Sequence, residues 1–197
     1  MAILVLIIWF DISPYNDLLR ANLKKYNIPH HSAHYKDFSH IDLSKYTHFI
    51  ISGTDTLYVP KGDLALSKGQ ILGLLATGKP ILGSCYGFHL LAYYLSSPKD
   101  VKGFKAKHYV NVHLSSPLLD PGHIYLMNHN NYVPHLNSDW DVISTSTYRD
   151  SDGIDKTFIL DAVMKHYPVL GIQYHPEATP SNSEFMKQWV YNEFPLS

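Results

Sequence analysis

The first half of the chain alternates short apolar runs with segments of helical periodicity. The apolar runs cover residues 2–9, 46–51 and 81–82, and a further short strand is expected at residues 28–33. The near-continuous hydrophobicity of residues 2–9 is typical of a strand that is buried on both faces. Leu18, Leu19 and Leu23 recur at helical spacing after the first run, where Ser13 and Pro14 suit the cap and the first position of a helix.

A second helix is expected over about residues 63–76, because Thr77-Gly78-Lys79-Pro80 ends it with a glycine and then a proline. A third apolar helix follows at residues 88–95. Strands that alternate with helices imply right-handed crossovers and a parallel sheet, whose ligands bind at the carboxyl ends of the strands. We therefore predict an α/β fold with a mainly parallel sheet flanked by helices.

The second half has a different pattern, in which strands follow one another through turns. The expected strands cover residues 110–114, 124–127, 142–147 and 158–164, and a last apolar strand covers residues 169–174. Asp152-Gly153 is a hairpin signal between two of them, and a closing helix is expected at residues 184–192. These strands predict antiparallel additions to the parallel sheet.

Composition narrows the class of protein. A chain of 197 residues with 45% apolar and 17% charged residues is most simply one globular domain, residues 1–197. The formal net charge of -1 gives no field that would recruit nucleic acid or an anionic membrane. The apolar run at the start is too short to span a bilayer and lacks the basic region of a signal peptide. A single cysteine forms no internal disulfide, which favours a reducing compartment and predicts a cytoplasmic protein.

That cysteine, Cys85, lies in Gly83-Ser84-Cys85-Tyr86-Gly87, between an apolar strand and an apolar helix. Glycines on both sides allow a turn too tight for residues with a Cβ, and such a turn lifts the central side chain above the edge of the sheet. The thiol also comes close to a helix N-terminus, where a thiolate is favoured. Cys85 is therefore a candidate nucleophile; the alternative is a buried cysteine that packs as a small hydrophobic residue.

A second signal is Gln173-Tyr174-His175-Pro176-Glu177, directly after the last apolar strand. In extended chain, residues two apart face the same side, so His175 and Glu177 can converge on one site. A thiol needs a base near neutral pH, and a histidine needs a third group that fixes its tautomer. Cys85, His175 and Glu177 supply these parts, although His175 alone reads as an ordinary histidine and Glu177 alone as a solvated carboxylate.

The sequence gives no sign of a cofactor or metal. His30, His31, His34 and His40 lack a coherent ligand geometry, because the adjacent His30 and His31 would diverge on a strand. The chain also has no glycine-rich phosphate-binding loop followed by Lys-Ser or Lys-Thr. We expect neither a metal nor a bound nucleotide.

At the two motifs the chain resembles the class I glutamine amidotransferases. Their paired hallmarks are a Gly-x-Cys-x-Gly turn and a Gln-Phe/Tyr-His-Pro-Glu segment about ninety residues later, here Gly83–Gly87 and Gln173–Glu177. The likeness runs through Gly53 and covers essentially the whole chain, as in the stand-alone amidotransferase subunits of GMP synthase and anthranilate synthase. It implies the flavodoxin-like fold of that family.

The resemblance also implies a reaction. Cys85 would attack the side-chain amide of glutamine, His175 would protonate the departing ammonia, and Glu177 would orient His175. A γ-glutamyl thioester would form and water would release glutamate. The backbone N–H groups of Tyr86 and Thr54 would hold the oxyanion. Ammonia would pass to a synthetase partner, which would also supply any ATP chemistry.

Two departures from the family pattern, and one stretch that matches it, affect substrate binding. The family usually has glutamine where this chain has His89, a side chain of different shape and charge. It usually has a second glycine where this chain has Thr54, and threonine resists a positive φ. Asn128, Asn130 and Asn131 match a stretch that contacts the amino-acid end of the substrate, and Asn130 stands in for glycine because asparagine tolerates left-handed backbone.

These observations leave three functions open. The first is a glutaminase that feeds ammonia to a separate synthetase. The second is a hydrolase of another γ-glutamyl compound, which the substitutions at His89 and Thr54 motivate. The third is a non-catalytic regulatory module on the same fold, against which the intact Cys85, His175 and Glu177 argue.

Overall fold

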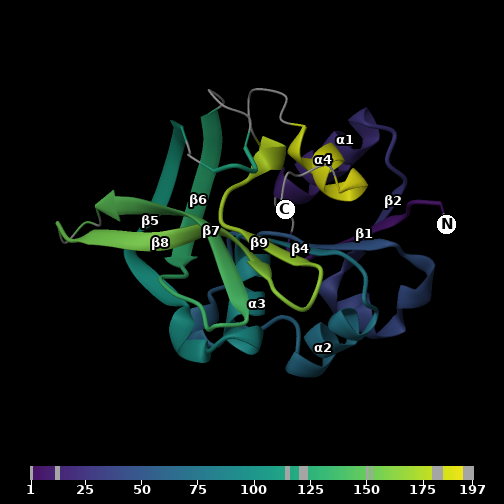
Figure 1. Ribbon diagram of the computed structural model, residues 1–197, viewed down its shortest axis with the longest axis horizontal. Helices are drawn as coiled ribbons and strands as arrows, with labels where there is room; N and C mark the ends of the chain where they lie inside the picture. The colour runs from purple at the N-terminus through teal and green to yellow at the C-terminus, as the bar shows by residue number, and fades with distance from the viewer. Residues whose placement is uncertain are drawn as a thin grey trace.

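The computed structural model describes residues 2–11, 14–113, 116–119, 124–149, 151, 153–178 and 184–192. Among these, one sheet has seven strands in the order β2-β1-β3-β4-β9-β8-β7, and β5 and β6 form a separate pair (Figure 1). The strands are β1 (Val5–Trp9), β2 (His30–His34), β3 (His48–Ile51), β4 (Ile81–Ser84), β5 (Lys102–His113), β6 (Ile124–Tyr132), β7 (Trp140–Arg149), β8 (Asp155–Met164) and β9 (Val169–Ile172). The helices are α1 (Pro14–Lys25), α2 (Lys68–Ala76), α3 (Tyr86–Leu95) and α4 (Phe185–Tyr191).

Strand direction divides the main sheet in two. β1 pairs in parallel with β2 and β3, and β4 pairs in parallel with β3 and β9. β8 is antiparallel to both β9 and β7, and β5 is antiparallel to β6. This arrangement confirms the predicted α/β fold, with a parallel sheet from the first half of the chain and antiparallel strands from the second.

Helices cover both faces of the parallel part, α1 and α4 on one face and α2 and α3 on the other (Figure 1). β1 shows how the sequence produces these layers. Val5 and Ile7 pack into the cluster that includes α1 and α4, whereas Leu6 and Ile8 pack into the cluster that includes α2 and α3. All four are fully buried, because successive side chains of a strand point to opposite faces.

Several boundaries differ from the predicted ones. α2 begins at Lys68 because Ser67 caps it: the Ser67 hydroxyl accepts from the Gln70 N–H, and the Gln70 side chain accepts from the Ser67 N–H. β5 and β6 are longer than predicted because each supplies backbone partners for the other. The predicted cap Ser13, Leu114 at the end of a predicted strand, and Asp152 of the hairpin signal lie outside the described residues.

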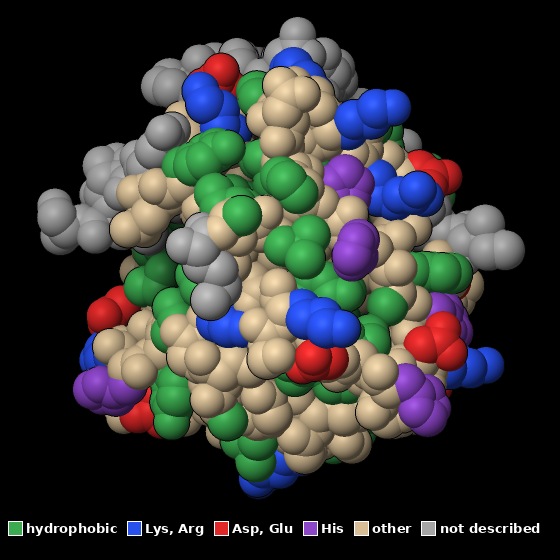
Figure 2. Space-filling model, turned by 90° about the vertical axis from the view of Figure 1, so that its right-hand side faces the viewer, with side chains coloured by type: hydrophobic (Ala, Val, Ile, Leu, Met, Phe, Trp, Pro, Cys, Tyr) green, Lys and Arg blue, Asp and Glu red, His purple; other side chains and the backbone are tan. Residues whose placement is uncertain are grey.

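The parallel strands define two edges of the sheet. The carboxyl edge is formed by the ends of β1, β3, β4 and β9 at Trp9, Ile51, Ser84 and Ile172. The amino edge is formed by the starts of the same strands at Val5, His48, Ile81 and Val169. Figure 2 looks onto the side of the amino edge, where hydrophobic side chains gather in the middle of the face.

None of the described helices has the length and hydrophobicity that crossing a bilayer requires, and α1, with 12 residues, is the longest of them.

Candidate active site

Cys85 occupies a strained turn at the carboxyl edge, between β4 and α3. Its φ of 51° and ψ of -105° lie in a region that residues with a side chain rarely adopt. The Cys85 N–H donates to the Ile172 carbonyl at 2.7 Å, and the Cys85 carbonyl accepts from the His89 N–H at 3.0 Å. The neighbouring strand and the new helix therefore hold the turn from both sides.

The flanking glycines allow helix α3 to approach the sheet closely. A Cβ on Gly87 would lie 2.1 Å from the Ile51 carbonyl oxygen, and a Cβ on Gly83 would lie 2.9 Å from the Gly87 carbonyl carbon. Both distances are too short for a real contact. The tight turn predicted from these glycines is confirmed.

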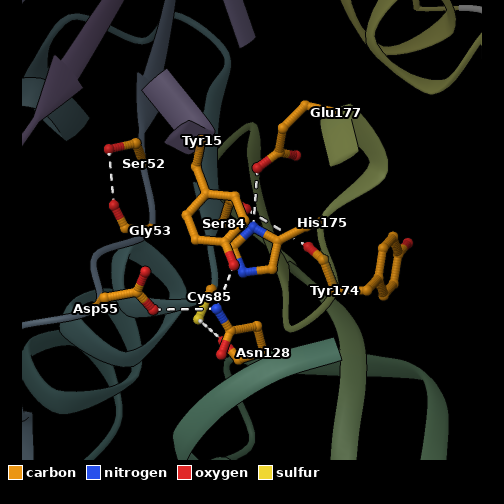
Figure 3. A network of polar contacts seen from close by, with 10 residues as sticks. All are labelled: Tyr15, Ser52, Gly53, Asp55, Ser84, Cys85, Asn128, Tyr174, His175 and Glu177. Atoms are coloured by element: carbon orange, nitrogen blue, oxygen red, sulfur yellow. Dashed lines mark hydrogen bonds and ion pairs between the residues drawn. The ribbon is translucent and has the colours of Figure 1, made fainter. Parts of the chain in front are cut away.

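Gly53, Cys85 and His175, which are far apart in the sequence, come together at this turn. A Cβ on Gly53 would lie 2.8 Å from His175 Cε1 and 3.4 Å from Cys85 Cβ, so Gly53 leaves the space in which the imidazole and the thiol come together. Cys85 is buried, and its thiol donates to the backbone carbonyl of Asn128 at 3.6 Å (Figure 3).

His175 and Glu177 form a buried pair. His175 Nδ1 lies 2.8 Å from Glu177 Oε1, with both side chains withdrawn from solvent (Figure 3). The route differs from the predicted one: β9 ends at Ile172, and Pro176–Ala178 form a 3-10 turn that brings the carboxylate back over the imidazole. The two groups meet through this turn and not through the alternation of an extended strand.

Electrostatics favour the protonated form of His175. Burial on its own lowers the pKa of His175, but the charge of the Glu177 carboxylate, a hydrogen bond with the Cys85 side chain and the hydrogen bond that Nδ1 donates to Glu177 outweigh it and raise the pKa to about 10. Near neutral pH the imidazole therefore carries a proton beside the thiol. This is the state that a proton donor to a leaving group requires.

Tyr15 is a site residue that sequence reasoning missed. Its ring stacks on His175, with centroids 4.1 Å apart and planes 16° from parallel (Figure 3). Its hydroxyl accepts from the side-chain amide of Asn128. Burial raises the pKa of Tyr15, and nearby negative charge raises it further. The available signal is its place at the start of α1, the first helix after β1.

Thr54 occupies its position without left-handed backbone. The described residues with a side chain and a positive φ are Asn27, Cys85 and Asn192. The Thr54 hydroxyl donates to Asp11 at 2.5 Å, and Asp11 follows β1. The concern that a positive φ would be needed at Thr54 thus does not apply, because a side-chain anchor holds the loop instead.

His89 makes a buried pair with Gln173. His89 Nε2 lies 2.8 Å from Gln173 Oε1, and a carbonyl oxygen only accepts, so Nε2 carries the hydrogen. Burial lowers the pKa of His89 to about 4, so the ring is neutral near pH 7 and its Nδ1 is an acceptor. Within the described part of the chain, neither His89 Nδ1 nor Gln173 Nε2 has a hydrogen-bond partner.

The asparagine stretch lies on strand β6 and not in a loop. Asn130 has no positive φ, so the expectation that it replaces a glycine in left-handed backbone is wrong; it lies within β6, between His129 and Asn131, which both pair with β5. Asn128 donates to Asp55 at 3.0 Å and Asn130 donates to the Tyr58 hydroxyl at 3.0 Å. The Asn131 carbonyl lies 2.7 Å from Nδ1 of the buried His129.

These groups surround a narrow pocket at the carboxyl edge. Its described lining includes Thr54, Asp55, Cys85, Tyr86, His89 and the three asparagines. The cavity volume is about 10 Å³, room for about one water molecule. A substrate of amino-acid size must therefore widen it on binding. Gly53 lies beside the turn that carries Cys85. The Tyr86 N–H follows Cys85 directly, at the start of α3.

The histidines near β2 bond to their own surroundings. Nδ1 of His30 lies 2.9 Å from the Ile28 carbonyl, Nδ1 of His31 lies 3.2 Å from the Tyr46 hydroxyl, and Nε2 of His34 lies 3.0 Å from the Phe10 carbonyl. No group of three or more histidine, cysteine or acidic residues in the described ranges is arranged to hold a metal ion.

Comparison with known structures finds the same fold. A GMP synthase subunit from Thermoplasma acidophilum has a TM-score of 0.71 at 18% identity, over 98% of this chain and 97% of that one. PurLQS from Thermotoga maritima has a TM-score of 0.68 at 14% identity, over 98% and 99% of the two chains. At these identities the likeness shows the fold alone.

Sequence comparison gives relatives of higher identity that are longer than this chain. GMP synthase [glutamine-hydrolyzing] from Caldicellulosiruptor saccharolyticus is 27% identical over 58% of this chain and 22% of its own length. The carbamoyl phosphate synthase small chain of Helicobacter pylori is 29% identical over 91% of this chain and 44% of its own length. The chain thus spans less than half the length of these curated relatives.

The family model described as glutamine amidotransferase class-I matches residues 13–194, nearly the whole chain. The protein therefore belongs to the class I glutamine amidotransferase family.

Proposed function

We propose that the protein hydrolyses the side-chain amide of glutamine through a cysteine thioester and delivers the ammonia to a separate synthetase. The observation that carries this proposal is the Cys85 thiol on a strained turn, beside an imidazole that a buried carboxylate keeps protonated. Family membership supports glutamine as the substrate.

In the proposed reaction, Cys85 Sγ attacks the amide carbon of glutamine as a thiolate while His175 holds the proton. The carbon becomes tetrahedral and its oxygen gains negative charge, which the backbone N–H groups of Tyr86 and Thr54 stabilise. His175 then gives its proton to the amide nitrogen, the carbon–nitrogen bond breaks, and ammonia leaves. The product on the enzyme is a γ-glutamyl thioester.

Water completes the cycle. The neutral His175 takes a proton from water as its oxygen attacks the thioester carbon, and the carbon–sulfur bond breaks to give glutamate and the Cys85 thiolate. Glu177 accepts the hydrogen bond from Nδ1 throughout, so that Nε2 keeps facing the thiol. In this proposal Gly53, His89, Asn128, Asn130 and Asn131 form the substrate-binding walls.

A separate partner is part of the proposal. The relatives are named as a glutamine-hydrolysing GMP synthase and the small chain of carbamoyl phosphate synthase. We propose that a synthetase binds this chain and consumes the ammonia, that residues 1–197 act as one amidotransferase domain, and that both proteins work in the cytoplasm.

The test measures glutamate released from glutamine by the purified chain, alone and with candidate synthetases. We expect slow release alone and faster release with the true partner, and no release by Cys85→Ala. A folded protein that releases no glutamate with any candidate synthetase would contradict the proposal.

A second candidate is hydrolysis of another γ-glutamyl compound through the same thioester. The neutral His89, whose unpartnered Nδ1 is an acceptor beside the pocket, favours it, because a glutamine at this position would offer an amide N–H as well. A panel of γ-glutamyl amides and peptides separates the two candidates. Preference for one of these over glutamine, with a gain of glutaminase activity in His89→Gln, selects the second.

A further inference from the structure

The loop after β3 is fixed in a way that turns one carboxylate toward the pocket. The hydroxyls of Thr54 and Thr56 both donate to the same oxygen of Asp11, at 2.5 and 2.9 Å. Asp55, between them, reaches the other way and accepts from the side-chain amide of Asn128 at 3.0 Å (Figure 3). The hydrogen bonds of Thr54 and Thr56 to Asp11 thus hold the loop so that the Asp55 side chain points toward Asn128.

Asn128 connects this carboxylate to the nucleophile. Its backbone carbonyl accepts from the Cys85 thiol at 3.6 Å, while its side-chain amide donates to Asp55 and to the Tyr15 hydroxyl. The carboxylate and the sulfur are therefore separated by the width of a single residue. The side-chain N–H of Asn128 already donates to the Asp55 carboxylate. A substrate ammonium is a stronger donor and would bind to the same carboxylate.

The charge of the pocket is one-sided. The described lining residues include Asp55 but no lysine or arginine. His89 is neutral near pH 7, because burial lowers its pKa. The negative charge of Asp55 acts on the site, since it adds to the effect of burial in raising the pKa of Tyr15. A cation is the ligand chemistry that such a wall selects.

We propose that Asp55 is a specificity-determining residue that holds a cationic ammonium group of the substrate while Cys85 attacks the amide. This role rests on the proposed amide hydrolysis. In a γ-glutamyl compound, four bonds of about 1.5 Å separate the attacked carbon from the α-nitrogen, so the ammonium reaches roughly 5 Å from that carbon. A carboxylate one residue away from the sulfur matches this reach.

An ammonium group can come from two parts of a γ-glutamyl substrate. One is the α-amino group of the glutamyl unit, and the other is a cationic amine on the leaving side of the amide. Three substrates distinguish them: L-glutamine, Nα-acetyl-L-glutamine and a γ-glutamyl amide of a diamine. A γ-glutamyl alkylamide of similar size, which is uncharged on its leaving side, is the reference for the diamine compound.

The variant is Asp55→Asn, which removes the charge and keeps the size, and Asp55→Glu keeps the charge. We expect Asp55→Asn to raise KM for the ammonium-bearing substrate about 10- to 100-fold, the size of a lost charge-assisted hydrogen bond, with a much smaller change in kcat. Asp55→Glu should recover part of this loss. Asp37→Asn, an equal charge change at an exposed residue, should leave KM unchanged.

The pattern over substrates identifies the source of the ammonium. If Asp55 holds the α-amino group, Asp55→Asn loses most of its preference for L-glutamine over the Nα-acetyl compound. If it holds a leaving-group amine, the variant loses its preference for the diamine compound over the alkylamide. Equal KM values for wild type and Asp55→Asn on all four compounds would overturn the inference while leaving the amide hydrolysis intact.

A binding measurement separates this inference from the hydrolysis itself. In the Cys85→Ser background, calorimetry gives the Kd of each compound with and without Asp55→Asn. An increase in Kd of about 10-fold or more supports Asp55 even where wild-type protein releases no glutamate, provided that it is confined either to the compounds with a free α-amino group or to the diamine compound. Identical Kd values, or no binding of any compound, would overturn it.

Discussion

The two edges of the parallel sheet differ in size, polarity and chemistry. The amino edge holds a groove of about 430 Å³ with a mainly apolar lining that includes His48, Pro80, Tyr167 and Trp189. The carboxyl edge holds a pocket of only about 10 Å³, with Cys85 in its wall. The larger cavity is therefore at the end of the sheet that lacks the thiol, the protonated imidazole and the strained turn.

The difference teaches that topology, and not cavity size, locates the candidate chemistry. Parallel strands end together at the carboxyl edge, so the loops after β1, β3, β4 and β9 meet there. The segments at the amino edge are those that lead into the starts of these strands. Side chains from four distant segments thus converge at one edge. The following predictions test whether activity belongs to the carboxyl edge and stability alone to the amino edge.

The largest effect is expected from Cys85→Ala. Without the sulfur no thioester forms, so glutamine turnover should fall by about 10⁴-fold or more while the fold persists. His175→Ala should have an effect of similar size, because the leaving ammonia loses its proton donor. Steady-state kinetics with circular dichroism check both. Turnover within tenfold of wild type in Cys85→Ala would place the chemistry elsewhere.

Glu177→Gln should have the next largest effect, a loss of about 10²- to 10⁴-fold in kcat. The variant keeps the hydrogen bond to Nδ1 but removes the charge that raises the pKa of His175, which leaves burial to lower it. Activity that needs the imidazolium should then decline as the pH rises through the neutral range, where wild type holds steady. A pH–rate profile unchanged in shape would contradict this role for Glu177.

At the amino edge, Trp189→Ala should change stability and not chemistry. Trp189 is buried, and the centroid of its ring lies 5.3 Å from the centroid of the His48 ring. Its removal should lower the free energy of unfolding by about 3–5 kcal/mol, with kcat per folded molecule within about twofold of wild type. Denaturant titration and kinetics on the same sample measure the two quantities. A large loss of kcat without a loss of stability would break the comparison.

The smallest effect is expected in the pH dependence of stability. Two buried histidines contribute to it with opposite signs, because their pKa values shift in opposite directions. His89 has a pKa of about 4 in the folded protein against 6.5 unfolded, so the unfolded state binds more protons and stability falls as the pH drops from 6.5 to 4. His175 has a raised pKa of about 10, so its contribution is full below 6.5 and is lost as the pH rises through 10.

Variants isolate the two contributions. His89→Gln should reduce the slope of unfolding free energy against pH between pH 4 and 6.5 by about one proton and leave the slope at alkaline pH unchanged. His175→Gln should reduce the slope at alkaline pH and leave the slope at acid pH unchanged. Urea midpoints at a series of pH values measure the slopes. An acid-side slope equal in wild type and His89→Gln would show that His89 is not held neutral.

Much of the fold was predictable because local rules and the final packing agree. The near-continuous apolar runs became β1, β3 and β4, and the glycines around Cys85 predicted the tight turn. The length of β6 was not predictable, because the strand continues past Met127 by pairing with β5, where Asn128 lies opposite Tyr109 and Asn131 opposite Gly103. Such pairing depends on residues far apart in the sequence, to which a reading of local pattern has no access.

The candidate site divides in the same way. Cys85, His175 and Glu177 stand in motifs with local signals, whereas Tyr15 and Asp55 act through partners from other segments. Neither the stacking of Tyr15 on His175 nor the contact of Asp55 with Asn128 has a counterpart in sequence spacing. The anchoring of Thr54 by Asp11 likewise needs the ends of β1 and β3 side by side.

The most direct test of the account is mass spectrometry of the intact protein, quenched with acid after brief exposure to glutamine and then digested to locate any adduct. The account predicts one added glutamyl group on Cys85 in the wild-type protein and none in Cys85→Ala. Glutamate release without a covalent glutamyl group on Cys85, or an adduct on another residue, would contradict it.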